Sequence, residues 1–257
     1  MSSTNTASDE LRQILAEIFS DDDNFPGIES VRNLLTKVSE ALRYELLSAI
    51  TDDYRTTVLT EAARRGHAEL CVTLLSSLPS ADRLKLILVD QFTALHWAAL
   101  RGHTETVSGI LNCLTADQQL QLLFTQDSNG NTALHWAALG GLTETVKTLL
   151  DKLTPEQQLH LLSVKNEEGK TALHDAAREG HTETVKILLD NLTPEQQLKL
   201  LAVQNDEGMT ASQVASGLSG NKTEKILEQY RIEADHGVNY REFAEFTQSL
   251  NRNKNFN

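Results

Sequence analysis

The sequence predicts an all-α repeat solenoid, because one block of residues recurs along the chain at a fixed spacing and carries helix signals in every copy. The tetrapeptide Thr-Ala-Leu-His begins at residues 93, 132 and 171, so the period is 39 residues. Each copy continues with an Ala-Ala pair, a Gly and the run Thr-Glu-Thr-Val. Weaker copies begin at Thr57 and Thr210, which makes about five repeats.

The first helix of each repeat is expected directly after the recurrent threonine. Its hydroxyl can accept a hydrogen bond from an amide of the first helical turn, which is the role of an N-cap. The Ala pair keeps the helix thin enough for close packing, and the Gly ends it, since glycine tolerates a left-handed backbone. A second helix is expected from Thr143 in the central copy, where Val146, Leu149 and Leu150 fall on one face.

A third, short helix is predicted at the sequence Leu-Thr-Pro-Glu-Gln, which occurs twice. Threonine serves as the N-cap, proline suits the first helical position, and an acid suits the first turn. Three of the four prolines, Pro79, Pro155 and Pro194, mark the starts of these helices. A hairpin finger then leads to the next repeat, because the spacing of Asp127 and Gly130 is typical of a tight turn.

Together these motifs resemble the ankyrin repeat. The resemblance rests on Thr-Ala-Leu-His-x-Ala-Ala, on the Gly-His pairs at 102–103 and 180–181, and on the turn Asx-x-x-Gly-x-Thr, and it covers residues 57–230. The chain has Ala where the family usually has Pro, and its surplus over the usual length of about 33 residues falls at the third helix. Long repeats with these Leu-Thr-Pro-Glu-Gln elements are also similar to ankyrin proteins of intracellular bacteria, some of which are delivered into host cells.

The resemblance implies a domain organisation of caps and repeats. The repeats are expected at 57–92, 93–131, 132–170, 171–209 and 210–230. Residues 28–56 align with the second and third helices of a repeat and are predicted as an N-terminal cap, preceded by a flexible segment, residues 1–27, with a short helix. Residues 231–257 are predicted as a C-terminal helix and tail, with a turn at Asp235–Asn239 before the helix and disorder from residue 251.

The composition excludes several classes of function. The formal charge is −13, from 36 acidic and 23 basic residues, so the average field repels nucleic acid and anionic membrane surfaces. Cys71 and Cys113 are too few for a disulfide framework and are expected as thiols in the cytoplasm. Neither an export signal nor a membrane span is expected. No self-complementary patch is evident in the sequence, and a monomer is therefore expected.

No candidate catalytic, cofactor or metal site withstands a physical test. His96, His135 and His174 recur, but packed helices stand roughly 8–10 Å apart, whereas zinc requires ligand nitrogens within about 2.1 Å of one ion. The resemblance assigns these histidines a structural role. Residues 231–242 resemble part of a calcium-binding loop, yet Arg231 stands where the first carboxylate is needed. We therefore expect no enzymatic activity and no cofactor.

The resemblance implies that a partner protein binds the concave surface formed by the first helices and the fingers. Positions there that differ between repeats are predicted to contact the partner: Trp97, Leu100, Arg101, Asn129, Asn131, Trp136, Leu139, Glu167, Glu168, Lys170, Asp175, Arg178, Glu179, Asp206, Glu207 and Met209. The two tryptophans can either anchor a partner or pack against a neighbouring repeat. The acidic fingers favour a partner with a basic segment. The first finger is shorter, which places the main contact over repeats two to four.

The predicted function is therefore a non-enzymatic protein–protein interaction module. One setting is a secreted bacterial effector that acts on a host protein, as the resemblance to long-repeat bacterial ankyrins suggests. The alternative is a scaffold or regulatory subunit within the producing cell. An activity carried by the terminal segments is disfavoured, because they are too short to build a catalytic core.

Overall fold

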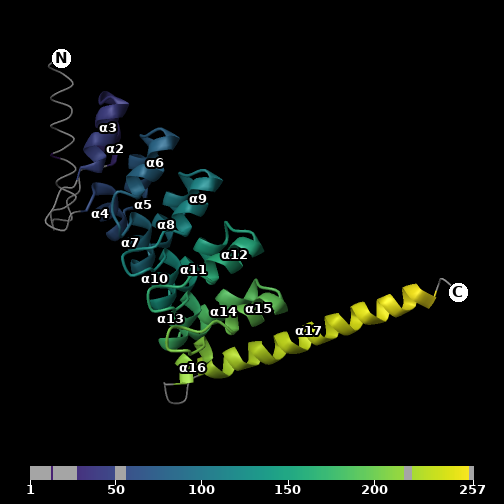
Figure 1. Ribbon diagram of the computed structural model, residues 1–257. Coiled ribbons are helices and arrows are strands. Elements are labelled where there is room, and N and C mark those ends of the chain that lie inside the picture. The colour runs from purple at the N-terminus through teal and green to yellow at the C-terminus, as the bar shows by residue number, and fades with distance from the viewer. Residues whose placement is uncertain (1–12, 14–27, 50–55, 217–221, 255–257) are drawn as a thin grey trace. The chain divides into compact units, whose positions relative to one another are not determined.

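The computed structural model describes residues 28–49, 56–216 and 222–254, together with Gln13, and these ranges consist of helices joined by turns and short loops (Figure 1). They contain sixteen helices, α2 to α17. The extended pairing found among them is one isolated antiparallel bridge, between Gln204 and Thr210. The chain divides into two compact units, residues 1–151 and 152–257, and each unit is made of helical repeats. The predicted all-α repeat fold is confirmed, whereas the segment predicted over residues 1–27 lies outside the described ranges apart from Gln13.

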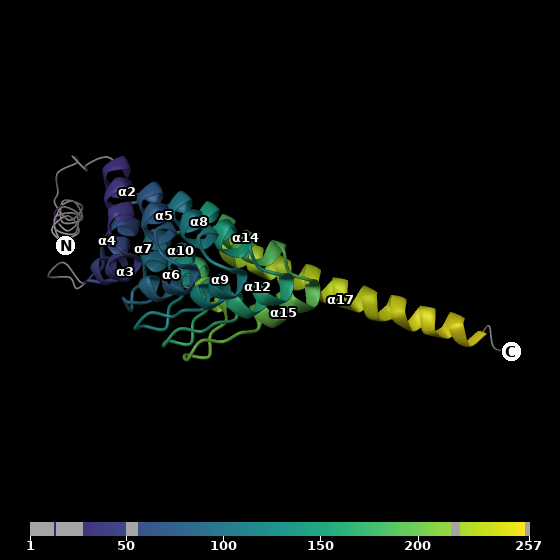
Figure 2. The same ribbon diagram turned by 90° about the horizontal axis from the view of Figure 1, so that it is seen from above.

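Unit 1 contains three rows of helices (Figure 2). Its helices are α2 (Ile28–Lys37), α3 (Glu40–Ser48), α4 (Val58–Arg64), α5 (Ala68–Ser76), α6 (Ser80–Ile87), α7 (Ala94–Arg101), α8 (Thr104–Asn112), α9 (Ala116–Leu123), α10 (Ala133–Leu139) and α11 (Thr143–Leu150). The first helices α4, α7 and α10 pack in one row, and α2, α5, α8 and α11 pack in a second. Because α2 packs on α5 and α3 packs on α6, these two helices correspond to a second and a third helix, and no first helix precedes them within the described residues 28–49.

Unit 2 contains α12 (Pro155–Leu162), α13 (Ala172–Arg178), α14 (Thr182–Asp190), α15 (Pro194–Leu201), α16 (Ala211–Ser216) and α17 (Lys222–Lys254). The first helices α13 and α16 pack on one another, and α12 packs on α15. Helix α17 takes the place of a second helix against α14 and also contacts α15 and α16. It then continues past them as one long helix (Figure 1).

The continuity of α17 corrects the sequence analysis. The predicted turn at Asp235–Asn239 is wrong, and the boundary placed between residues 230 and 231 lies inside this 33-residue helix. Gly237 was taken as a turn residue, but a Cβ there would lie 3.1 Å from the Cγ of Pro194, so its small size permits close packing on α15. Residues 251–254 are helical rather than disordered, and the segment that resembled a calcium-binding loop has no loop.

The recurrent threonine and histidine cap each other in every full copy of the motif. The Thr93 hydroxyl accepts a hydrogen bond from the His96 amide at 3.4 Å, and the Thr93 amide donates to His96 Nδ1 at 3.1 Å. This is a capping box in which imidazole replaces the usual Glu or Gln. Thr132 with His135 and Thr171 with His174 repeat it.

The cap also fixes the histidine tautomer. Since a backbone amide can only donate, Nδ1 must accept, and the ring proton resides on Nε2. In His96 this Nε2 donates to the carbonyl of Asn131 at 3.1 Å, and in His174 it donates to the carbonyl of Met209 at 3.1 Å. Helices α7 and α13 thus each hold the finger that leads into the following repeat. Burial lowers the pKa of His96 and of His174, in keeping with the neutral ring that this arrangement requires.

The first repeat satisfies the N-terminus of its first helix with different residues. Thr60 stands at the histidine position, and the Oδ2 atom of Asp90 accepts hydrogen bonds from the Thr60 hydroxyl at 2.5 Å and from the amide of Thr57 at 3.2 Å. Asp90 lies in the shortened first finger. A finger side chain therefore replaces the finger carbonyl, and the N-terminus of α4 is still satisfied.

A second ladder of hydroxyl groups joins the second helices. Thr104 Oγ1 lies 2.8 Å from Thr145 Oγ1 in unit 1, and Thr182 Oγ1 lies 2.8 Å from Thr223 Oγ1 in unit 2. Thr106 occupies the position of Thr145 one repeat earlier, but the preceding repeat has Ala68 where a hydroxyl would be needed. Accordingly, Thr106 Oγ1 is the one fully enclosed side-chain polar atom without a hydrogen-bond partner in the described ranges.

Replacing Thr106 with valine is expected to stabilise the protein. The change removes an unsatisfied buried hydroxyl and keeps the shape of the side chain, which should raise the free energy of unfolding by about 1 kcal/mol. The matched substitution Thr145→Val removes a hydroxyl that is bonded to Thr104 and should lower it by about 1 kcal/mol. Urea denaturation followed by circular dichroism measures both changes. Equal destabilisation by the two variants would contradict this account of the ladder.

Candidate protein-binding surface

The predicted partner-binding residues all lie on first helices or fingers, and they divide between the two units. We call Trp97, Leu100, Arg101, Asn129, Asn131, Trp136 and Leu139 the unit 1 patch. We call Glu167, Glu168, Lys170, Asp175, Arg178, Glu179, Asp206, Glu207 and Met209 the unit 2 patch. All of them are exposed or half-buried except Asp175, which is 5% exposed.

The two tryptophans of the unit 1 patch pack on a residue that the sequence analysis missed. The ring of Phe92 makes edge-on contacts with Trp97 at 4.8 Å and with Trp136 at 5.4 Å between ring centroids. Such edge-to-face pairs favour a fixed arrangement of the rings. Phe92 precedes the capping threonine as Asn131 does in the next repeat, and that equivalence was the signal that could have identified it. Both indoles stay half-buried, so packing leaves part of each ring accessible.

The second finger of unit 1 is held by one carboxylate. Asp127 is 8% exposed, and its Oδ1 accepts from the amides of Asn129 at 2.8 Å and Asn131 at 3.0 Å. Its Oδ2 accepts from the indole N–H of Trp136 at 2.8 Å. Gly130 closes the turn with a left-handed φ of 76°, as its position in the motif predicted. The finger and the indole are therefore fixed together, which lowers the entropic cost of presenting Trp136 to a partner.

The unit 1 patch combines apolar and polar groups. Leu100 and Leu139 are half-buried near the ends of α7 and α10, while Arg101 and Asn129 are exposed. Asn131 has a structural role as well, because its carbonyl accepts from His96. An aromatic and aliphatic centre with polar groups around it is the composition that protein-binding surfaces favour.

In unit 2 the two fingers lie side by side. The amide of Asp206 donates to the carbonyl of Glu168 at 3.2 Å, and the ammonium of Lys165 donates to the carbonyl of Gln204 at 2.7 Å. Gly169 has a φ of 70°, and a Cβ there would lie 2.3 Å from the carboxylate of Asp206. Glycine is therefore needed at this position both for its left-handed backbone and for the close approach of the next finger.

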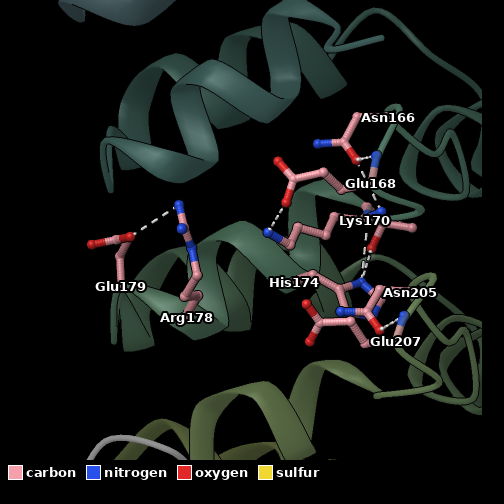
Figure 3. A network of polar contacts seen from close by, with 9 residues as sticks. Asn166, Glu168, Lys170, His174, Arg178, Glu179, Asn205 and Glu207 are labelled. Carbon is pink, nitrogen blue, oxygen red and sulfur yellow. Dashed lines mark hydrogen bonds and ion pairs between the residues drawn. The ribbon is translucent and has the colours of Figure 1, made fainter. Parts of the chain in front are cut away.

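The unit 2 patch is predominantly acidic and internally paired. Glu167, Glu168, Asp206 and Glu207 are exposed on the two fingers. Figure 3 shows Lys170 extended over α13 and paired with Glu168, and Arg178 paired with Glu179 at 3.2 Å at the far end of that helix. Such exposed pairs contribute about 0–1 kcal/mol each. They leave a negative surface in which each of the two cations is paired with a carboxylate.

Asp175 has an environment unlike that of the rest of its patch. It lies on α13 between Lys170 and Arg178 in the sequence, and its carboxylate accepts no hydrogen bond from the described residues. Burial is the largest influence on this group and raises its pKa to about 6, against the opposing effects of Arg178 and Lys170. Glu168 and Glu179 add to the rise. The fold thus holds a carboxylate that is largely withdrawn from water and has no compensating donor.

Replacing Asp175 with asparagine is expected to stabilise the protein above pH 6. The folded-state pKa is raised from its ordinary value of 3.8 to about 6, so the charged form disfavours folding above pH 6, and this penalty disappears as the pH falls toward 4. The difference corresponds to no more than about 3 kcal/mol. Thermal unfolding of both proteins between pH 4 and 8 measures it. A stability difference that grows at low pH would contradict the assignment.

Two further observations concern metal binding and membrane insertion. Within the described ranges, no group of three or more His, Cys, Asp or Glu side chains is arranged to hold a metal ion. Among the same residues, no helix combines the length and the apolar content needed to cross a bilayer.

Comparison with known proteins identifies the family of this fold and surface. A search of curated proteins finds no match. A family model described as ankyrin repeats in three copies matches residues 27–121, 59–161, 116–200 and 157–236. These overlapping matches extend over more than half of the chain and include the half-repeat formed by α2 and α3. Ankyrin repeats generally mediate protein–protein interaction. The chain belongs to the ankyrin-repeat family.

Proposed function

We propose that the chain is a non-enzymatic interaction module that binds a partner protein through the unit 1 and unit 2 patches. One observation carries this proposal: the residues that differ between repeats lie on first helices and fingers and, except for Asp175, are exposed or half-buried, whereas the recurrent Thr-Ala-Leu-His and Ala-Ala residues are buried and hold the framework. A rigid framework with variable side chains is how repeat proteins provide binding surfaces. The specificity of the module then resides in the two patches.

The histidines support a binding role rather than a catalytic one. Both ring nitrogens of His96 and of His174 are engaged in the cap and in the neighbouring finger. A general base must be within reach of a substrate proton, and these rings face the framework instead. Their recurrence follows from the capping box that each Thr-Ala-Leu-His copy forms.

The chemistry of the patches suggests what the partner offers. The unit 1 patch presents Trp97, Trp136 and two leucines, which suit apolar or aromatic side chains. The unit 2 patch presents exposed carboxylates on both fingers, which attract a basic segment and raise its rate of encounter. We propose a monomeric, cytoplasmic module that recognises a protein carrying both features.

Two cellular settings remain for this module. It acts either as a bacterial effector delivered into a host cell or as a scaffold or regulatory subunit within the producing cell. The source of the bound partner separates them, because an effector binds a host protein and a scaffold binds a protein of the producing cell. Detection of the chain in infected cells gives an independent measurement of delivery.

Substitutions in either patch are expected to reduce capture of the partner at least about tenfold. The unit 1 variant carries Trp136→Ala and Leu139→Asp, and the unit 2 variant carries Arg178→Glu. Lysates of bacterial and of eukaryotic cells are passed over each immobilised protein, and the partner enriched on the native chain is quantified by mass spectrometry. Circular dichroism and the unfolding temperature establish that the variants are folded.

Matched controls lie on the third helices, outside both patches. Gln121→Asp on α9 introduces a charge as Leu139→Asp does, and Lys199→Glu on α15 reverses a charge as Arg178→Glu does. Both control residues are exposed, and the control variants should retain the partner. A partner that binds the patch variants as well as the native chain would show that the patches are not the binding surface.

A further inference from the structure

We propose that the carboxylate of Asp175 receives an arginine side chain of the partner protein. This inference rests on the proposed function and specifies the chemistry that one patch recognises. It follows from the burial of Asp175, from the charges around it, and from a comparison with Glu61, which occupies the same repeat position.

Asp175 lacks the donor that a buried carboxylate requires. The residue is 5% exposed, yet no described residue donates a hydrogen bond to its carboxylate. Thr106 Oγ1 is the one fully enclosed side-chain polar atom of the described ranges without a hydrogen-bond partner, so the Asp175 oxygens, which also lack one, retain some access from outside. A buried charge is costly unless it is paired and hydrogen-bonded. A partner that supplies the missing donors removes this cost on binding, and the free energy recovered adds to the affinity.

The surrounding charges do not fill this role. Lys170 is paired with Glu168 on the finger, and Arg178 is paired with Glu179 on the helix (Figure 3). Helix α16, which packs against α13, has no charged residue. Helix α14 also packs against α13, and its charged residues are Glu183, Lys186 and Asp190, the first two of which pair with each other at 3.1 Å.

In the first repeat, the acid at the same position is hydrogen-bonded to arginine side chains. Glu61 is also 5% exposed, and Arg64 donates to both of its oxygens, at 2.7 and 2.6 Å. Arg65 adds a third bond at 2.5 Å. Together these arginines lower the pKa of Glu61 against the effect of burial, which is the largest single influence and acts to raise it. The direction is opposite to that at Asp175, although both carboxylates are equally withdrawn from water.

Two sequence differences explain why Asp175 stays unsatisfied. Both repeats have arginine three residues after the acid, Arg64 and Arg178, but the fourth position is Arg65 in one and Glu179 in the other. Glu179 pairs with Arg178, and aspartate is one methylene shorter than glutamate. The guanidinium on the helix that carries Asp175 is therefore paired with Glu179 and donates no hydrogen bond to Asp175, unlike that of Arg64 at Glu61.

The pattern at Glu61 also indicates which cation fits. Arg64 binds through two N–H groups, a two-point geometry that a planar guanidinium provides and an ammonium does not. The exposed carboxylates of the unit 2 fingers attract such a cation toward the patch. An arginine of the partner would then supply at Asp175 what Arg64 supplies at Glu61.

The first test uses peptides of defined charge and shape. N-acetyl-Ala-Arg-Ala-amide is titrated into the full chain at pH 7.5, and the carboxyl carbon of Asp175 and the nearby amides are followed by NMR. Peptides with citrulline or lysine in place of arginine are the comparisons, since citrulline keeps the shape without the charge. We expect a saturable shift with the arginine peptide and about tenfold weaker binding of the citrulline peptide.

Variants separate the Asp175 carboxylate from the general negative field. Asp175→Asn should abolish the preference for arginine over citrulline, whereas Glu156→Gln, an exposed change on α12 with the same loss of charge, should retain it. The double variant Asp175→Glu with Glu179→Arg rebuilds the arrangement of Glu61, Arg64 and Arg65 and should bind the arginine peptide about as weakly as Asp175→Asn. Binding to the native chain should also weaken as the pH falls from 7.5 to 5, because the carboxylate becomes protonated.

Several outcomes would overturn the inference. Equal binding of the arginine and citrulline peptides, or of the arginine and lysine peptides, would exclude a guanidinium site. Arginine selectivity that survives in Asp175→Asn would place it elsewhere. If the partner is lost on the unit 1 variant but retained on Asp175→Asn, the proposed function stands and this inference fails. If the arginine preference holds while no patch substitution affects partner capture, the proposed function fails instead.

Discussion

The contact of His96 and of His174 with the following finger is the interaction on which the rest of the framework depends. In His96 and His174, Nδ1 completes the cap of its own helix, and Nε2 donates to a carbonyl of the next finger, that of Asn131 or of Met209. The bond therefore fixes the first helix and the finger together, and these are the two elements that carry the variable side chains. Because the fingers are anchored through backbone atoms, residues such as Asn131 and Met209 can change their side chains without loss of the bond. Framework and recognition are chemically separate in this way, although they share the same positions.

Much of the fold could be predicted from the sequence because it is expressed by local signals that repeat. The capping threonines, the Leu-Thr-Pro starts of α12 and α15, and the left-handed glycines each depend on a few neighbouring residues. What could not be predicted depends on contacts between segments distant in sequence. Gly237 was taken for a turn because its packing against Pro194 is not visible in the sequence. The role of Asp90 was missed for the same reason, since its carboxylate accepts a hydrogen bond from Thr60, a residue at the histidine position thirty residues earlier.

The candidate surface was predicted less completely than the fold. Its positions followed from alignment of the repeats, but their environments did not. Phe92 was overlooked even though it lies under both indoles, and Asp175 was selected as an ordinary variable residue. The comparison of Asp175 with Glu61 shows that one repeat position can hold an acid with or without hydrogen-bonded arginines, according to the length of the acid and the residue four places later. Retaining an unneutralised acid lowers stability, which is a common property of sites kept for binding.

The ladder of threonine hydroxyls and the ladder of histidine rings also limit how the number of repeats can change. In both ladders a repeat hydrogen-bonds to groups of the repeat beside it, so no repeat is complete alone. A duplicated block of 39 residues, cut between any two equivalent positions, carries both a donor and an acceptor half and inserts without leaving a polar group unmatched. At the boundary between the first two repeats, Ala68 supplies no hydroxyl. The hydroxyl of Thr106 therefore has no hydrogen-bond partner among the described residues. Growth by duplication is thus favoured in the interior copies, where successive blocks are interchangeable, and disfavoured next to the N-terminal repeat.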